Sequence, residues 1–394
     1  MGGKPSESPM SPLYSLVALL SSVFLLVSGN ALVSVVAPVR ASLDGFGDLA
    51  VGLLGSAYFA GMLAGALKTP ALVRRVGHIR AFAAFVAIGG VAIDLLPTLE
   101  FPAAWLISRA LVGFVLAGVY AIIESWINGS ASNANRGALY AIYQIVNFCA
   151  SSTGQLLMGG LDPTTFLPFA VGSAFYALSI VPLALTKADA PELPSVVRVD
   201  LAAIRKLAPV SLAGAFIAGA CNGASISLAP VYALQIGVTP GKVPLFTSAI
   251  VIGSALGVYP VGRLSDRVDR RLIMAVTMAA GAAMEIALAV IAPTGAPLIA
   301  SGFLVGLTTF TLYMLTASIA NDGAQSHEMV LISAGLLFVY CTAAIASPAI
   351  ASVAMRNFGP SALFWQNGVC HAALALFSGL AFQKAAMGVN YRRQ

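Results

Sequence analysis

Twelve long apolar runs constrain the fold of this chain more than any other feature of its sequence. Each is at least 18 residues long, so an α-helix rising about 1.5 Å per residue could cross roughly 30 Å of hydrocarbon. With 59% hydrophobic and 9% charged residues, a soluble fold is excluded. The runs lack the alternation of barrel strands, which excludes a β-barrel. They cover residues 13–39, 49–67, 80–97, 102–123, 138–160, 164–186, 207–231, 241–262, 272–291, 296–320, 329–353 and 361–383.

The distribution of basic residues predicts the orientation of these helices. If the N-terminus is cytoplasmic, seventeen lysines and arginines fall in cytoplasmic segments and three fall outside, namely Arg40, Lys242 and Arg356. Cytoplasmic loops of membrane proteins carry such an excess of basic residues. We therefore predict a multi-pass membrane protein with both termini cytoplasmic. The net charge of +6 reflects this topology and implies no nucleic-acid partner.

A polar segment divides the chain into six runs plus six. The stretch TKADAPELPSVVRVDLAAIRK holds three acidic residues, four basic residues and two prolines, a composition typical of a linker along the inner membrane face. We predict an N-terminal tail (1–12), a first six-helix bundle (13–186), a linker (187–206), a second six-helix bundle (207–383) and a C-terminal tail (384–394).

An internal repeat supports this division. LVGFVLAGVYAIIESWIN at 111–128 aligns without gaps to LVGLTTFTLYMLTASIAN at 304–321, a shift of 193 residues. A second match, which pairs Gly61 with Gly253 among other positions, has a shift of 192 residues. Two matches at nearly equal shifts predict that the halves share one fold.

The stretch GRLSDRVDRR, residues 262–271, carries six charges between two apolar runs. Together with the twelve runs, the repeat and the central linker, it resembles the signature loop of the major facilitator superfamily, and the resemblance covers essentially the whole chain. It implies an all-α polytopic membrane protein with twelve transmembrane helices in two pseudo-symmetric six-helix bundles. Within the superfamily, ESWINGSASNANRGALYAIY at 124–143 resembles the YcaD-like bacterial branch. This resemblance implies a location in the bacterial inner membrane.

The resemblance also implies a role for the charged loop. In the superfamily such loops brace the cytoplasmic gate, whereas a simpler interpretation makes this loop a topology anchor alone. The counterpart in the first half, TPALVRRVGHIR at 69–80, has Arg74 where the family has Asp, so we expect the second loop to dominate. The gate residues we predict are Gly262, Asp266, Arg267, Arg271 and Arg136.

Ionisable residues inside a membrane span are costly and usually functional. Arg109 opens RALVG, which resembles part of an antiporter motif of the superfamily. Asp94 is its nearest candidate partner, and snorkelling outward is the structural alternative. Glu124 follows Tyr120 by one helical turn and could carry a coupled proton or pair with a loop base. For Glu285, in the ninth run, we expect a structural ion pair or a protonated acid.

Polar side chains at helical spacing predict a cavity between the halves. A stripe of residues three and four apart runs along the fifth run, and such a face avoids lipid. Any single Ser or Thr could instead bond its own helix backbone. The cavity residues we predict are Asn30, Tyr120, Gln144, Asn147, Gln155, Asn222, Tyr313 and Tyr340.

These features predict a secondary active transporter rather than an enzyme. The sequence has no phosphate-binding loop, and its four cysteines and three histidines form no metal-binding motif, so we expect no cofactor and no metal. We expect a monomer that moves a small neutral or weakly cationic amphipathic solute by alternating access, with proton-coupled efflux. Its partners would be this solute, protons and membrane lipids. The alternatives are a proton-coupled uptake symporter and a membrane sensor or assembly factor without transport.

Overall fold

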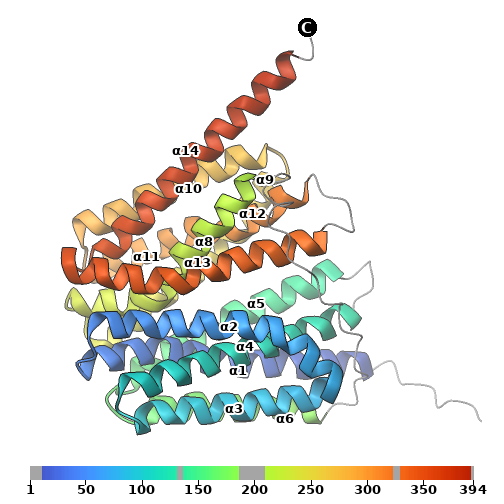
Figure 1. Cartoon of the computed structure of the whole chain (residues 1–394), viewed down its shortest axis with the longest axis vertical. Helices are drawn as coiled ribbons and strands as arrows, with labels where there is room; N and C mark the ends of the chain where they lie inside the picture. Colours follow the sequence, from blue (N-terminus) through green and yellow to red (C-terminus); the bar gives the residue numbers. More distant parts are fainter. Residues whose placement is uncertain (1–10, 131–135, 186–208, 323–328, 392–394) are drawn as a thin grey trace, which may run out of the picture.

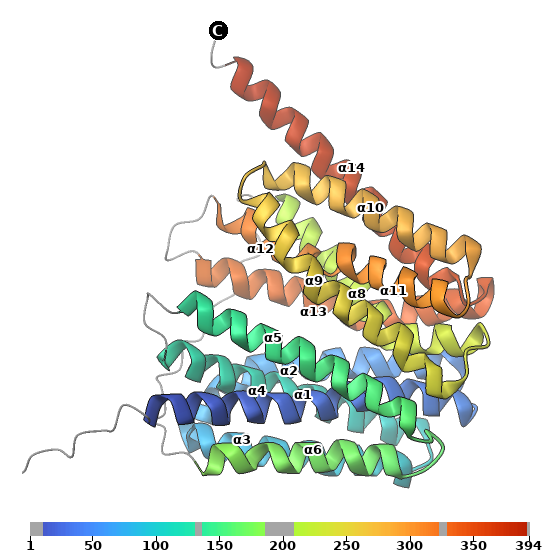
Figure 2. The same ribbon diagram turned by 180° about the vertical axis from the view of Figure 1, so that it is seen from behind.

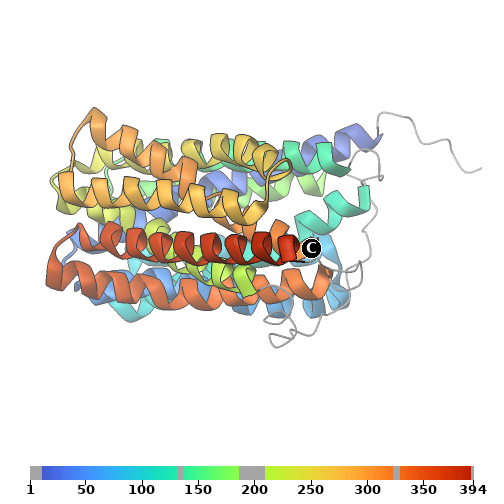
Figure 3. The same cartoon turned by 90° about the horizontal axis from the view of Figure 1, so that it is seen from above.

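The protein is a bundle of long α-helices that run roughly along one axis (Figure 1 and Figure 3). The structure, a computed structural model, describes residues 11–130, 136–185, 209–322 and 329–391, and every regular element in these ranges is helical. The α-helices are α1 (Ser11–Leu43), α2 (Asp48–Val76), α3 (His78–Thr98), α4 (Pro102–Ser130), α5 (Arg136–Leu157), α6 (Leu167–Ala184), α8 (Pro209–Gln235), α9 (Val243–Ser265), α10 (Arg270–Ile291), α11 (Ala296–Thr309), α12 (Leu312–Asn321), α13 (Met329–Phe358) and α14 (Ala362–Tyr391). Two short 3-10 helices are η1 (Met158–Gly160) and η2 (Pro240–Lys242).

Each predicted run corresponds to one of these helices or, for 296–320, to the pair α11 and α12. In the described part of the chain, ten spans are long and apolar enough to cross a membrane. The two helices that are not apolar enough are α5, whose polar stripe includes Gln144 and Asn147, and α14, which carries Asn367 and His371. Helix α5 packs against α1 and α9, and α14 packs against α10 and α8 at the edge of the bundle, beyond which its C-terminal part projects (Figure 2). Asn147, Asn367 and His371 therefore lie on protein-facing surfaces, whereas Gln144 is exposed.

The tenth run is broken where the sequence predicts one helix. Around the break, Thr308 and Thr309 donate to carbonyls one turn earlier in α11, and Thr311 Oγ1 donates to the Thr308 carbonyl over 2.7 Å. Such bonds compete with the regular backbone ladder and bend helices. The regular α-helix is interrupted only at Phe310 and Thr311, whose backbone stays in the right-handed helical region, and the span continues as α12.

The internal repeat is confirmed by equivalent backbone contacts in the two halves. Gly61 of α2 lies against the Ala110 carbonyl of α4, and its counterpart Gly253 of α9 lies against the Phe303 carbonyl of α11. The same correspondence holds for Gly113 against α2 and Gly306 against α9. Glycine lets two helix backbones approach this closely, and any side chain at these positions would overlap a carbonyl oxygen.

The two ends of the bundle differ. The linker end is where α4, α6 and α12 end and α5, α8 and α13 begin; the far end is the opposite one, where η1 and η2 lie. At the far end the halves are in contact: Gly52 of α2 lies against Ser352 of α13, and Gly159 of η1 lies 3.2 Å from the Gly241 carbonyl of η2, measured from the position of an added Cβ. The halves therefore close together at the far end.

Two predicted boundaries differ from the structure, and a third cannot be compared with it. The segment 69–80 is mostly helix, because α2 continues through Pro70 to Val76 and only Gly77 forms the turn, with a φ of 86° that favours glycine. At the other terminus, α14 extends to Tyr391, into the predicted tail (Figure 1). The predicted linker, 187–206, lies outside the described residues.

Candidate functional site

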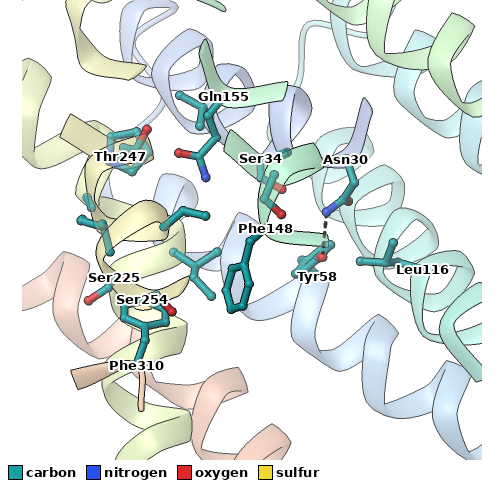
Figure 4. A pocket seen from close by; sticks show the side chains of 18 of the residues that line it. Asn30, Ser34, Tyr58, Leu116, Phe148, Gln155, Ser225, Thr247, Ser254 and Phe310 are labelled. Atoms are coloured by element: carbon teal, nitrogen blue, oxygen red, sulfur yellow. Dashed lines mark hydrogen bonds between the residues drawn. The ribbon is translucent and has the colours of Figure 1, made fainter. Parts of the chain in front are cut away.

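A cavity of about 320 Å³ lies between the two halves. Figure 4 shows Asn30, Ser34 and Tyr58 on one side, facing Ser225 and Thr247 of the second half. The lining combines apolar and aromatic side chains with hydroxyl and amide groups, and no Lys, Arg, His, Asp or Glu is among its described residues. The polar lining residues are Asn30, Ser34, Tyr58, Tyr120, Ser151, Gln155, Ser225, Thr247, Ser254 and Tyr340. The chemistry it offers is apolar contact and neutral hydrogen bonding.

Asn30 orders the wall formed by the first half. Its Nδ2 donates to the Tyr58 hydroxyl of α2 over 3.3 Å, and the Tyr176 hydroxyl of α6 donates to its Oδ1, also over 3.3 Å. One amide in the middle of α1 thus joins three helices. Because buried polar groups need partners, this network fixes where the Tyr58 hydroxyl meets the cavity.

Arg109 lies behind this wall. The residue is only 5% exposed, and its guanidinium carbon lies 4.6 Å from the centroid of the Tyr58 ring, a cation–π contact. Its Nε and Nη1 have no hydrogen-bond partner among the described residues. The expected pairing with Asp94 is not seen: the described residues give no ion pair between them, and Asp94 Oδ1 is itself unpartnered. A buried cation held mainly by an aromatic ring therefore touches the cavity wall from outside.

A second polar layer is repeated in the two halves. The Tyr120 hydroxyl donates to Asn147 Oδ1 over 3.2 Å. Tyr313 and Tyr340 occupy the same positions one repeat of 193 residues later. Their rings meet edge to face with centroids 5.2 Å apart, and Tyr340 is also hydrogen-bonded to the side chain of Asn222. The repeat thus places a tyrosine that contacts a polar partner on each side of the cavity.

The predicted cavity residues fall into two groups. Asn30, Tyr120, Gln155 and Tyr340 line the cavity. The others do not: Asn147, Asn222 and Tyr313 stand behind lining residues that they contact, and Gln144 is exposed on α5.

Sequence reasoning missed the lining residues of α2 and α9. Tyr58 and Met62 occupy repeat positions equivalent to Ile250 and Ser254, and all four line the cavity. Once either pair had been recognised as lining the cavity, the repeat alignment would have predicted the other pair.

Glu124 lies near the linker end of α4 and is exposed. Its carboxylate is close enough to Tyr120, Tyr140 and Tyr143 to interact electrostatically with their hydroxyls. It has no ion-pair partner in the described ranges, and the Arg136 side chain lies outside the described residues. Glu124 does not line the cavity but stands one turn below Tyr120, which does.

The charged loop joins α9 to α10 at the linker end, and its bonds differ in part from those expected. Asp266 pairs with a base as predicted, Arg270, at 3.1 Å. Arg270 also pairs with Asp322 at the end of α12, at 3.4 Å. The amide cap comes from Asp269, which accepts from the Arg271 amide over 2.8 Å.

Arg270 belongs to the predicted charged loop but was not among the predicted gate residues, and Asp322 was missed. Gly262 lies against Met314 of α12, while Arg267 and Arg271 have no side-chain ion pair in the described part of the chain. Every ion pair described at this end stays within the second half, so the loop braces α12, and among the described residues no ion pair joins the two halves here.

The chain matches the sequence profile of the Major Facilitator Superfamily over residues 19–348, with a second match over 211–386. The chain belongs to this superfamily. It is therefore a polytopic membrane transporter of the superfamily, as the predicted fold class and the resemblance required.

Relatives and solved structures agree with this membership. The chain is 28% identical to the uncharacterized MFS-type transporter YcaD of Escherichia coli O139:H28 over 355 residues, 88% of this chain and 90% of YcaD, and 27% identical to YcaD of Shigella flexneri serotype 5b over the same shares.

Its fold is similar to a mutant form of the nucleoside transporter NupG, with a TM-score of 0.76 and 12% identity over 94% of this chain and 100% of NupG. A bacterial homologue of the human lysosomal transporter Spinster, inward-facing and occupied, gives a TM-score of 0.75 and 17% identity over 95% and 96% of the two chains. At these identities the superfamily structures support the fold alone.

Proposed function

We propose that this protein exports a small neutral or weakly cationic amphipathic solute across the bacterial inner membrane by alternating access, coupled to protons and working as a monomer. The observation that carries the solute class is the uncharged lining of the cavity. A site that selects phosphates or carboxylates normally presents Arg or Lys to them. Here the guanidinium of Arg109 stands behind Tyr58 and outside the lining.

Alternating access is supported by the contrast between the two ends. The halves touch at the far end, and the ion pairs described at the linker end stay within one half. With the linker end cytoplasmic, as the basic residues predict, the protein is in an inward-facing state. Rocking of the two repeats about the cavity would open the far end. Both halves carry the same close glycine contacts inside each bundle, which suits movement as two units.

Proton coupling is assigned to the ionisable groups in the first half. Glu124 is a carboxylate one turn from the cavity residue Tyr120, so its proton could respond to a bound solute. Arg109 and Asp94 are half-buried or buried groups without ionic partners in the described ranges, and either could stabilise the opposite charge transiently. Efflux is favoured by the partial antiporter motif at Arg109.

Flux in proteoliposomes tests this proposal. The purified protein is reconstituted, a pH gradient is imposed, and accumulation of tetraphenylphosphonium (monocationic) or chloramphenicol (neutral) is followed against protein-free vesicles. We expect gradient-driven flux of at least one probe. If sugar phosphates are transported and neither probe is, the proposed solute class is wrong. Movement of a probe in the same direction as the protons would favour the uptake alternative.

Variants test the assignment of the coupling residues. Glu124→Gln keeps the size and hydrogen bonding of the side chain but cannot release a proton, so it should abolish pH-driven accumulation and keep solute exchange. The matched control is Glu100→Gln, which changes an exposed acid in the loop between α3 and α4. If Glu124→Gln and Asp94→Asn both retain full accumulation, the coupling assignment is wrong.

A further inference from the structure

A buried acid–base pair lies in the second half, outside the site described above. Nδ1 of His371 on α14 is 2.7 Å from Oε2 of Glu285 on α10, and each side chain is 1% exposed. Glu285 was expected to form a structural ion pair or to be a protonated acid, and the structure places His371 as its partner. Buried carboxylates and imidazoles are costly in a membrane span and usually serve a function.

The surroundings of the pair contain few other ionisable groups. The thiols of Cys370 on α14 and Cys221 on α8 face it, and within the described ranges no Lys, Arg or further acid does so. The second ring nitrogen of His371, Nε2, is buried and has no hydrogen-bond partner among the described residues. The charge of this region is therefore set by the protons that Glu285, His371 and the two neighbouring thiols hold.

Next to the pair, a polar contact connects α14 to the cavity wall. Asn367 precedes His371 by one turn of α14, and its Nδ2 donates to Ser225 Oγ on α8 over 2.8 Å. Ser225 lines the cavity. One turn earlier on α8, the Cys221 thiol approaches the Asn367 carbonyl, with the sulfur 3.9 Å from the oxygen. His371 therefore lies on the face of α14 that is hydrogen-bonded to α8, the helix that carries the cavity residue Ser225.

Helix α8 also takes part in the contact between the two halves. Ser227 of α8 lies against Gly55 of α2, next to Pro348 of α13. A small displacement of α8 would therefore change both the cavity wall at Ser225 and the packing that closes the far end.

We propose that Glu285 and His371 together form a second proton-binding site, which links proton uptake to the position of α8. With Glu285 ionised and His371 neutral, the pair carries one net negative charge. Uptake of one proton from water makes the pair neutral overall, and no other reactant takes part. A net charge in an apolar site is strongly disfavoured unless water or a counter-charge reaches it. The deprotonated pair therefore favours an arrangement of α8, α10 and α14 that admits water, and the protonated pair favours the packed arrangement seen here.

This inference rests on the proposed transport cycle, and its first test needs no solute. The full-length protein, with histidine rings labelled with ¹⁵N, is studied by nuclear magnetic resonance in lipid nanodiscs. Three histidines give few signals, and His371→Asn identifies that of His371. We expect His371 to change protonation state between about pH 5 and about pH 9. In Glu285→Gln the imidazolium signal should fall at least about tenfold at the pH where the wild-type signal is half-maximal. An unchanging protonation state across this range overturns the proposal.

The second test measures the link to conformation. Spin labels on p-acetylphenylalanine at Ile79 of α3 and Val268 of the α9–α10 turn, both partly exposed at the linker end, leave the native cysteines in place. The distance between them should change with pH at the midpoint found for His371. The double variant Glu285→Gln/His371→Asn leaves no buried charge unpaired and should remove this change. Glu100→Gln, at an exposed acid in the loop between α3 and α4 that has no proposed role in coupling, should keep it.

The outcomes separate this inference from the proposed function. A pH-dependent distance that survives in the double variant overturns the inference and leaves transport untouched. Absence of pH-driven flux in the wild type, with the titration and the distance change both present, overturns the proton-coupled transport and supports the pair as a proton-operated switch.

Discussion

Replacing Arg109 with Met should leave the protein as stable as the wild type, or more stable, while transport falls. Arg109 is 5% exposed, and neither its Nε nor its Nη1 has a partner in the described part of the chain. Met has a similar length and no charge. The variant would lose the cation–π contact with the Tyr58 ring, whose centroid lies 4.6 Å from the guanidinium carbon. It would also remove a buried charge, which is destabilising in the wild type.

The magnitudes decide the sign. A desolvated cation–π contact contributes about 2 kcal/mol. Burial of an unpaired ion costs several kcal/mol after relaxation. We therefore expect the free energy of unfolding to be unchanged or to rise by about 1–3 kcal/mol, which for a chain this long corresponds to roughly 2 °C in Tm per kcal/mol. Flux should nevertheless fall, because the positive charge behind Tyr58 is lost.

Thermal unfolding in nanodiscs and proteoliposome flux would be measured on the same preparations. The control is Arg75→Met, at an exposed position of α2, which should change stability by less than about 0.5 kcal/mol. A destabilisation of about 3 kcal/mol or more by Arg109→Met would refute the reasoning, since it would show that the variant strands a buried acid. Recovery of stability in Arg109→Met/Asp94→Asn would then identify that acid as Asp94.

Three further predictions concern the packing, the loop and the cavity wall. Gly61→Leu should destabilise the protein by about 3 kcal/mol or more and reduce its yield, because the new side chain would overlap a backbone carbonyl of α4. The control is Gly137→Leu, which should be tolerated because an added Cβ there meets nothing within 4 Å. Asp269→Ala should lower the free energy of unfolding by about 1 kcal/mol through loss of the α10 cap, with Asp269→Asn close to wild type in thermal unfolding. Asn30→Leu should lower the free energy of unfolding by about 2–4 kcal/mol and weaken binding of a fluorescent solute, because two tyrosine hydroxyls lose their partner. The control is Ser34→Ala, at a lining residue with no described side-chain hydrogen bond, which should change stability little.

The location of the helices was determined by local sequence alone. A run of apolar residues must satisfy its backbone internally in a membrane, so helix is the only available structure, and each predicted run lies on a described helix or helix pair. The repeat was also readable, because Gly61 and Gly253 are placed by the same demand for close backbone approach in each half. The break between α11 and α12 was not, since the Thr side chains that bond their own helix can equally stay in a straight one.

Tertiary structure alone decided which polar groups meet. The periodicity of a helix fixes the face on which a side chain lies but not the helix that this face will contact. Asn30 and Tyr176 are 146 residues apart, and Glu285 and His371 are 86 apart, so their bonds depend on how the helices are arranged around each bundle. For the same reason, sequence reasoning predicted Asp94 as the partner of Arg109, whereas in the folded protein Arg109 lies over the ring of Tyr58.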